Sequence, residues 1–236
     1  MMPNTQMRAP SLRAVLFDLD GVLVDSRRPI ARSINHALVR HGLPPRPDAS
    51  LHRWIGPPLH ETFVTLLQEA AADAALATSC VAAYREHYGR ASLEETTLFP
   101  GIAGLVTRLA GRTALAVATS KPVEFAGAIL RALGLAASFR AVVGPPLEAR
   151  AEPKEETVGR ALARLGLPAR AAAPAVMVGD RRFDVEAGRA HGLRTIGVAW
   201  GIGSREELCG AGADHLVESP QELETLLERL LAPRER

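Results

Sequence analysis

The segment Arg13-Ala14-Val15-Leu16-Phe17-Asp18-Leu19-Asp20-Gly21 decides the fold. Its run of apolar residues is typical of a strand that is buried on both faces of a parallel sheet. The strand ends in Asp18 and Asp20, which alternation places on the same side of the chain, and Gly21 lets the backbone approach a ligand closely. Asp and Gly also form ordinary turns. Two carboxylates at the end of an apolar strand nevertheless favour a functional site.

Similar β-rich runs recur along the rest of the chain, and helical patterns separate them. Strands are expected at 113–119, 141–144, 175–180, 195–199 and, more weakly, 215–217. Helices are expected at 101–110, 122–133, 155–165, 183–191 and 220–232. This alternation predicts an α/β fold with a doubly wound, Rossmann-like parallel sheet. Right-handed crossovers then bring the carboxyl ends of all the strands to one edge, where such sheets bind ligands.

Residues 27–91 break this alternation. Three groups of apolar residues recur there at intervals of four: Ile30, Ile34 and Leu38; Leu59, Phe63 and Leu67; and Leu76, Cys80 and Tyr84. Helical stripes without an intervening strand predict a small all-α cap domain, inserted after the first strand of a core formed by 11–26 and 92–236. Hinges are expected near 26–29 and 92–100.

Composition narrows the class of protein. The 236 residues carry a formal net charge of +2 and 47% hydrophobic residues, which suits a core domain with an insert and gives no reason to expect a nucleic-acid partner. The two cysteines lie far apart without a CxxC spacing, and neither a signal peptide nor an apolar run long enough to span a bilayer is evident. We therefore expect a cytoplasmic protein without a membrane partner, as a monomer or homodimer.

Acidic residues also end a second predicted strand. Asp180 and Asp184 follow the run 175–180 and lie one helical turn apart. Carboxylates that converge on one sheet edge need a hard cation between them, and oxygen ligands without His or Cys suit Mg²⁺. Asp184 also fits an ordinary role as a partner of the helix dipole at a helix N-terminus.

Two further segments carry polar groups at the ends of predicted elements: hydroxyl groups lie at the end of the predicted strand 113–119, and an ammonium group precedes the predicted helix 155–165. Thr119 and Ser120 precede a helix, where backbone N–H groups can bind phosphate, although such residues are usually N-caps. Lys154 begins another helix among glutamates and alone is typical of a surface lysine. A cation is needed there to balance the carboxylates and a phosphate ester, and the crowded negative charge suits Asp20 as a general acid.

Taken in order, four motifs resemble those of the haloacid dehalogenase superfamily of phosphohydrolases, close to its phosphoglycolate phosphatase-like branch. They are FDLDGVLVDS at 17–26, VATSKP at 117–122, PKEE at 153–156 and VMVGDRRFD at 176–184. The resemblance implies a Mg²⁺-dependent phosphatase of small phosphorylated metabolites, such as phosphoglycolate or a nucleoside monophosphate. It also implies that the helical insert closes over the substrate.

The resemblance further implies a role for each motif residue. Asp18 is expected to be the nucleophile that forms an aspartyl phosphate, and Asp20 the acid and base. Lys154 is expected to neutralise charge, and Mg²⁺ to be held by Asp18, the Asp20 carbonyl and Asp180, with Asp184 in the outer shell. The phosphoryl oxygens are expected to meet Thr119 and the amides of Gly21 and Ser120, together with Lys154.

Other functions remain open on the sequence. A sugar phosphomutase would use the same residues, and a catalytically silent phosphate-binding relative would keep the fold. A dehalogenase needs no acid at Asp20, and a receiver domain lacks an inserted cap. Substrate selectivity is expected in the cap, with the loop 53–57 facing the site, where Arg53 could contact a second anionic group or be an ordinary surface cation. The glycines of 201–203 do not complete a GxGxxG motif.

Overall fold

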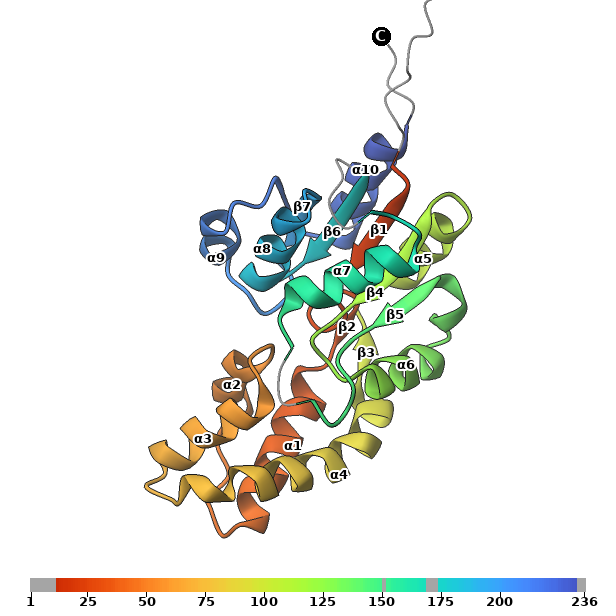
Figure 1. Ribbon diagram of the computed structural model, residues 1–236. Helices are drawn as coiled ribbons and strands as arrows, with labels where there is room; N and C mark the ends of the chain where they lie inside the picture. Colours follow the sequence, from red (N-terminus) through yellow and green to blue (C-terminus); the bar gives the residue numbers. More distant parts are fainter. Residues whose placement is uncertain (1–11, 150–151, 169–173, 233–236) are drawn as a thin grey trace, which may run out of the picture.

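The computed structural model describes residues 12–149, 152–168 and 174–232. Its centre is a six-stranded parallel sheet with the strand order β5-β4-β1-β6-β7-β8 (Figure 1). The strands are β1 (Ala14–Phe17), β4 (Ala114–Ala118), β5 (Ala141–Val143), β6 (Ala175–Gly179), β7 (Arg194–Val198) and β8 (His215–Val217). The predicted α/β fold with a doubly wound sheet is therefore confirmed, including the weak strand at 215–217.

Helices cover both faces of this sheet. The helices are α5 (Ile102–Ala110), α6 (Val123–Ala132), α7 (Lys154–Arg164), α8 (Arg182–Ala190), α9 (Arg205–Gly210) and α10 (Pro220–Leu231). Helices α5, α6 and α10 pack on one face, and α7 and α8 pack on the other (Figure 1). Helix α9 lies beside β8 and was not expected from the sequence, although Ser204 caps its N-terminus by accepting from the Glu207 N–H at 3.1 Å.

The two faces of the sheet differ in side-chain size. Toward α5, α6 and α10 the strands present large residues such as Val15, Phe17 and Val117. Toward α7 and α8 they present smaller ones such as Ala14 and Ala116. Since side chains alternate along a strand, the continuous apolar runs of the sequence supply both faces. Small residues let α7 and α8 pack close to the sheet. The predicted site residue Lys154 begins α7, and the predicted site residue Asp184 lies in the first turn of α8.

The segment between β1 and β4 begins with a helical unit. It contains α1 (Arg27–Arg40), α2 (Asp48–Leu51), α3 (Leu59–Glu69) and α4 (Ala77–Glu95), together with two short 3₁₀ turns, His52–Trp54 and Ala74–Leu76. These helices share a hydrophobic cluster that includes Ile34, Phe63 and Tyr84 and is separate from the two clusters of the sheet. Figure 1 shows the unit, in orange and yellow, beside the carboxyl ends of the strands.

A short antiparallel ribbon connects the helical unit to the sheet. Strand β2 (Val24–Asp25) enters the unit and pairs with β3 (Thr97–Leu98), which leaves it. The chain thus departs and returns at one point, directly after the Asp18–Asp20 segment. No helix in the described ranges is both long enough and apolar enough to cross a bilayer.

Candidate active site

The carboxyl ends of β1, β4 and β6 bring together residues of three motifs, and the fourth motif contributes Lys154 from the start of α7. β1 lies between β4 and β6 in the sheet, with Phe17 in register with Val117 and Val178. The residues that follow these three strands therefore share one edge, although up to about 160 positions separate them in the sequence. This juxtaposition follows directly from the parallel topology.

Asp18 lies at the centre of the cluster and is 8% exposed. Its backbone N–H donates to the Val178 carbonyl at 2.9 Å, which extends the β1–β6 ladder by one residue and fixes the start of the side chain. The Lys154 ammonium donates to Asp18 Oδ1 at 2.7 Å. Lys154 is the first residue of α7 and is itself buried, so the sequence pattern of a surface lysine does not describe its environment.

Asp184 links the first turn of α8 to the same lysine. Its Oδ1 lies 2.7 Å from Lys154 Nζ, and its Oδ2 accepts the Arg181 backbone N–H at 3.1 Å. The helix-capping role and the site role considered from the sequence are therefore both present, each using one oxygen. Gly179 permits this approach, because a Cβ there would lie 2.0 Å from the Asp184 Cβ.

Asp180 is completely buried and has one unpaired oxygen. Its Oδ2 accepts the Ile202 backbone N–H at 2.7 Å, whereas Oδ1 has no hydrogen-bond partner. Two glycines surround this carboxylate: a Cβ would lie 2.1 Å from Oδ2 at Gly21 and 2.4 Å from it at Gly201. Gly21 also has a φ of +82°, so the turn after β1 requires glycine for its conformation as well as for space.

Burial raises the pKa values of Asp18 and Asp180. The pKa of Asp18 is raised to about 7, chiefly by loss of solvent, with Asp184 and Asp20 adding to the rise and Lys154 opposing it. Burial, and then the charges of Asp184 and Asp18, raise the pKa of Asp180 well above its ordinary value. Burial lowers the pKa of Lys154, but the two neighbouring carboxylates outweigh it and leave that pKa raised. The carboxylates therefore outnumber the one ammonium among them, and the cluster favours the binding of a cation.

The residues present fit a metal ion. Asp18, Asp180 and Asp184 each place one oxygen within 4.8 Å of the others, and all three are buried. The three carboxylates and one ammonium have a formal charge of −2, which one divalent cation would balance. The unpaired Asp180 Oδ1 supplies a free ligand atom. Hard oxygen donors of this kind bind hard divalent cations.

Asp20 lies beside this triad and is held at both oxygens. Ser26 Oγ donates to Oδ1 at 2.5 Å, and Lys121 Nζ lies 3.0 Å from Oδ2. The Lys121 ammonium also donates to the Tyr88 hydroxyl of helix α4. Lys121 was part of the quoted VATSKP motif but was given no role from the sequence. Its position two residues after Thr119, at the end of β4, was the available signal.

The predicted phosphate-binding residues occupy different environments. Thr119 is buried, and its Oγ1 accepts the Lys121 N–H at 3.1 Å, as an N-terminal turn residue would. The Ser120 side chain is exposed at the start of the same turn. The Gly21 N–H donates to the Val24 carbonyl at 2.9 Å and thus closes its own turn. Phosphate binding by these residues stays a prediction.

The helical unit contacts the core close to Asp180. Arg181 Nη1 donates to the Ile55 carbonyl at 2.7 Å, and Arg181 Nε donates to Glu207 at 2.9 Å. The loop 53–57 therefore lies next to the residue that follows Asp180. Arg53 extends away from this contact: it pairs with Glu69 of α3 at 3.2 Å and remains 63% exposed at its side chain.

The sequence did not single out two contributors to this region. The loop 201–203, considered only as an incomplete dinucleotide motif, supplies the Ile202 N–H to Asp180, and a Cβ at Gly203 would lie 2.0 Å from the Asp180 carbonyl oxygen. The spacing of the glycines at 201–203 was the visible signal in the sequence, but Asp180, which this loop contacts, lies about 20 positions earlier. Arg181 was visible only as a charge inside the fourth motif.

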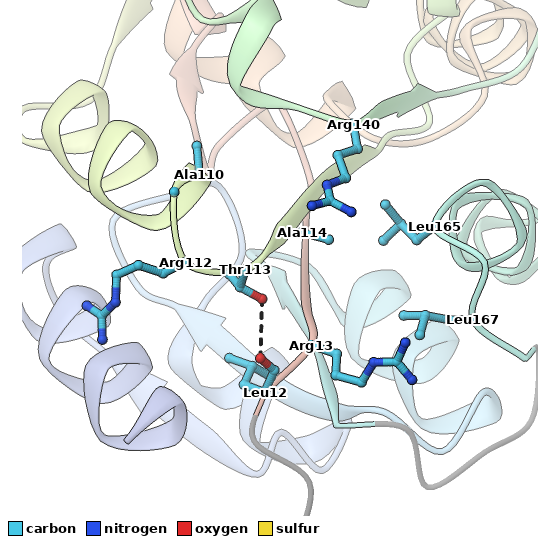
Figure 2. A pocket seen from close by; sticks show the side chains of 10 residues that line it. Leu12, Arg13, Ala110, Arg112, Thr113, Ala114, Arg140, Leu165 and Leu167 are labelled. Carbon is cyan, nitrogen blue, oxygen red and sulfur yellow. Dashed lines mark hydrogen bonds between the residues drawn. The ribbon is translucent and has the colours of Figure 1, made fainter. Parts of the chain in front are cut away.

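A cavity of about 370 Å³ lies at the opposite edge of the sheet (Figure 2). It is located at the amino ends of β1 and β4 and is lined by residues that include Arg13, Arg140 and Leu167. The Thr113 hydroxyl donates to the Leu12 carbonyl beside it, and none of the described residues that line it carries a carboxylate. The acidic cluster at the other edge of the sheet is therefore the stronger candidate for the active site.

Comparison with known proteins identifies the class. The profile of the haloacid dehalogenase-like hydrolase family matches residues 15–198, which contain all four motifs, and the chain belongs to this family. A 5'-nucleotidase from Pseudomonas aeruginosa is 37% identical over 228 residues, covering 96% of this chain and 99% of that protein. A phosphoglycolate phosphatase from Yersinia pseudotuberculosis is 30% identical over 207 residues, covering 86% and 88%.

Two further matches complete the comparison. The tyrosine-protein kinase PtkA from Mycobacterium tuberculosis is 41% identical over 199 residues, covering 82% of this chain but 64% of that protein. The crystal structure of a predicted phosphatase from Clostridium acetobutylicum superposes with a TM-score of 0.83 at 34% identity, covering 93% of this chain and 100% of that one. The resemblance noted in the sequence motifs is thus confirmed at the level of family and fold.

Proposed function

We propose that the protein is a Mg²⁺-dependent phosphatase of small phosphomonoesters, with phosphoglycolate and nucleoside monophosphates as the leading substrate types. The observation that carries the proposal is the environment of Asp18. A buried carboxylate with one oxygen on Lys154 lies in an acidic triad, with a second carboxylate two residues further along the chain. The names of the related nucleotidase and phosphoglycolate phosphatase support the substrate class.

In this proposal Asp18 is the nucleophile. Its free oxygen attacks phosphorus in line, the bond from phosphorus to the alcohol oxygen breaks, and an aspartyl phosphate forms. Lys154 holds Asp18 Oδ1 and so directs the other oxygen toward the substrate. The same ammonium stabilises negative charge on the phosphoryl oxygens. Water then attacks the aspartyl phosphate and regenerates the Asp18 carboxylate with release of inorganic phosphate.

Asp20 transfers the protons in both half-reactions. It gives a proton to the leaving alcohol oxygen and later takes one from the attacking water. Its two oxygens are held by Ser26 and by Lys121, which fixes the plane of the carboxyl group. An alkoxide is a poor leaving group, so this proton transfer matters most for esters of alkyl alcohols.

Asp18, Asp180 and the Asp20 carbonyl would hold Mg²⁺, with Asp184 in the outer shell. When bound, the ion supplies positive charge that neutralises the carboxylates and the phosphoryl group. The Ile202 N–H and the glycines around Asp180 fix that carboxylate and leave its Oδ1 without a hydrogen-bond partner among the described residues. We further propose that residues 27–91 act as a cap, because loop 53–57 reaches Arg181 at the edge of the site and can exclude water there.

The experiment is a phosphomonoester panel at fixed Mg²⁺, ranked by kcat/KM, with Asp18→Asn and Asp20→Asn as variants. Phosphate release that needs Mg²⁺ and disappears in Asp18→Asn supports the proposal. Isomerisation of a sugar phosphate without net phosphate release would show a phosphomutase instead. Full turnover by Asp18→Asn would refute the nucleophile.

The relationship to PtkA adds one arm to this panel. That protein is named as a tyrosine kinase, and this chain spans 64% of its length. A kinase would transfer phosphate from ATP to a tyrosyl hydroxyl, whereas the proposed enzyme transfers it to water. Incubation with ATP and a tyrosine peptide should therefore give free phosphate at most, and phosphotyrosine would overturn the assignment to hydrolysis.

A further inference from the structure

Lys121 is a buried cation that enters the proposed mechanism only through its contact with Asp20. It is 8% exposed, and its ammonium has two polar partners among the residues that the structure describes. One partner is Asp20 Oδ2 at 3.0 Å, and the other is the hydroxyl of Tyr88. A buried ammonium is costly unless it is paired, so both contacts stabilise one position of this side chain.

Whereas Lys121 belongs to the core, Tyr88 belongs to the helical unit. It lies on helix α4 of the cap, is 1% exposed, and stacks on Tyr84 with ring centroids 5.2 Å apart. The ring centroids of Tyr88 and Phe125, on core helix α6, lie 5.3 Å apart, and the two ring planes make an angle of 83°. Lys121 Nζ lies 4.5 Å from the Tyr88 ring centroid. Aromatic packing on two sides fixes the phenol, so the position of α4 determines where the hydroxyl lies.

The contacts of Asp20 complete a chain from cap to reacting group. Ser26, at the start of α1, holds Oδ1, and Lys121 holds Oδ2. If the Lys121 contact were lost, one oxygen would remain fixed and the carboxyl plane could rotate about it. A proton donor must lie within hydrogen-bond reach of the leaving oxygen in a defined orientation, so this rotation would slow proton transfer.

We propose that Lys121, held by Tyr88 of the cap, is a positioning residue that orients Asp20 toward the leaving-group oxygen when the cap lies against the core. The inference rests on the proposed function of Asp20. It adds two residues to the reaction, neither of which touches the phosphoryl group in the proposal, and it makes proton transfer dependent on the cap.

The test compares two esters that differ in their need for proton transfer. The p-nitrophenolate ion leaves without protonation, whereas the alkoxide of an alkyl phosphate does not. Because kcat/KM reports the steps through transfer of phosphate to Asp18, it isolates departure of the alcohol. The esters are p-nitrophenyl phosphate and the alkyl phosphomonoester with the highest kcat/KM in the panel.

Lys121→Met keeps the length of the side chain and removes its charge. We expect kcat/KM for the alkyl ester to fall about 100-fold, within the range of general acid catalysis, and that for the aryl ester to fall less than about 10-fold. Tyr88→Phe keeps the ring packing and should give the same selective loss, roughly 10-fold, because Lys121 remains. Lys121→Arg should recover part of the alkyl activity.

Tyr84→Phe is the matched control, since it removes a hydroxyl from the neighbouring stacked ring. Its ratio of alkyl to aryl kcat/KM should equal that of the wild type. Equal losses on both esters in Lys121→Met and Tyr88→Phe, or a change in KM alone, would overturn the positioning role. Thermal unfolding of each variant shows whether it is folded, and Tyr88→Phe provides the test if Lys121→Met is not.

Asp20→Asn separates this inference from the function on which it rests. If Asp20→Asn shows the selective loss and the Lys121 and Tyr88 variants do not, only the positioning role fails. If the wild type hydrolyses neither ester, or if Asp20→Asn loses both activities equally, the proposed function itself is wrong.

Discussion

When no divalent cation is bound, the stability of this protein should fall as the pH rises from 5 to 8. Asp18 has a pKa raised to about 7, against an ordinary value of 3.8, because it is buried beside other carboxylates. The folded state therefore binds a proton more tightly than the unfolded state does. A raised carboxyl pKa contributes stability that is complete below the unfolded value and is lost as the pH rises through the folded value.

The size of this effect follows from the two pKa values. At pH 5 the folded chain carries about one proton more than the unfolded chain at Asp18, and this excess falls to about half a proton at pH 7. A full proton changes the free energy of unfolding by about 1.4 kcal/mol per pH unit, so this free energy should drop by about 2 kcal/mol between pH 5 and 7. For a domain of this size the drop corresponds to a Tm lower by about 5–10 °C. Asp180, whose pKa is also raised, acts in the same direction.

Calorimetry in EDTA at pH 5, 6, 7 and 8 measures this slope, and Asp18→Asn is the control because it keeps every histidine and removes the carboxyl group. The variant should lose the part of the slope that arises from Asp18 and keep the part that arises from Asp180. Excess Mg²⁺ should also flatten the slope in the wild type, since the proposed ion would bring positive charge to the carboxylates. A wild-type Tm in EDTA that is constant over this range, or a slope equal to that of Asp18→Asn, would refute the electrostatic account of the cluster.

Three substitutions test other parts of the site. Gly201→Ala places a Cβ 2.4 Å from Asp180 Oδ2, so the carboxylate must move, and kcat/KM should fall about 100-fold while circular dichroism stays unchanged. Arg181→Gln removes the hydrogen bond to the Ile55 carbonyl, and KM should rise roughly 10-fold with a smaller effect on kcat. Arg53→Gln removes an exposed cation that pairs with Glu69 of the same helical unit, so the free energy of unfolding should change by less than about 1 kcal/mol. An unchanged KM across the phosphomonoester panel would show that Arg53 contacts no substrate anion.

Most of the sheet could be predicted because each strand combines a buried apolar run with a clear end signal. Periodicity also located the helices that pack on the sheet, since one face of each is buried. Helix α9 and the ribbon of β2 and β3 escaped detection because they are too short to show a period. The ribbon depends on pairing between Val24 and Leu98, a contact between distant residues that no local pattern contains.

The site was predictable where strand ends supply the chemistry, and less so where partners come from loops. Asp18, Asp180, Asp184 and Lys154 were chosen from the sequence, and the structure brings them together. Lys121 contacts Tyr88 of the helical unit, and Asp180 accepts a hydrogen bond from the backbone N–H of Ile202 in a separate loop. Such contacts depend on how separate segments meet in space.

The location of the helical insert has a direct consequence for the chemistry. The chain leaves the core at Asp25, five residues after Asp20, and Ser26 at the entrance to α1 donates to the Asp20 carboxylate. Phe99, on the return path, donates its N–H to the Leu23 carbonyl of the same turn. Any movement of the insert must therefore act on the segment that holds Asp20. An insert placed after any other strand of this sheet could cover the site, but it could not be joined so closely to Asp20, the group that we propose transfers the proton.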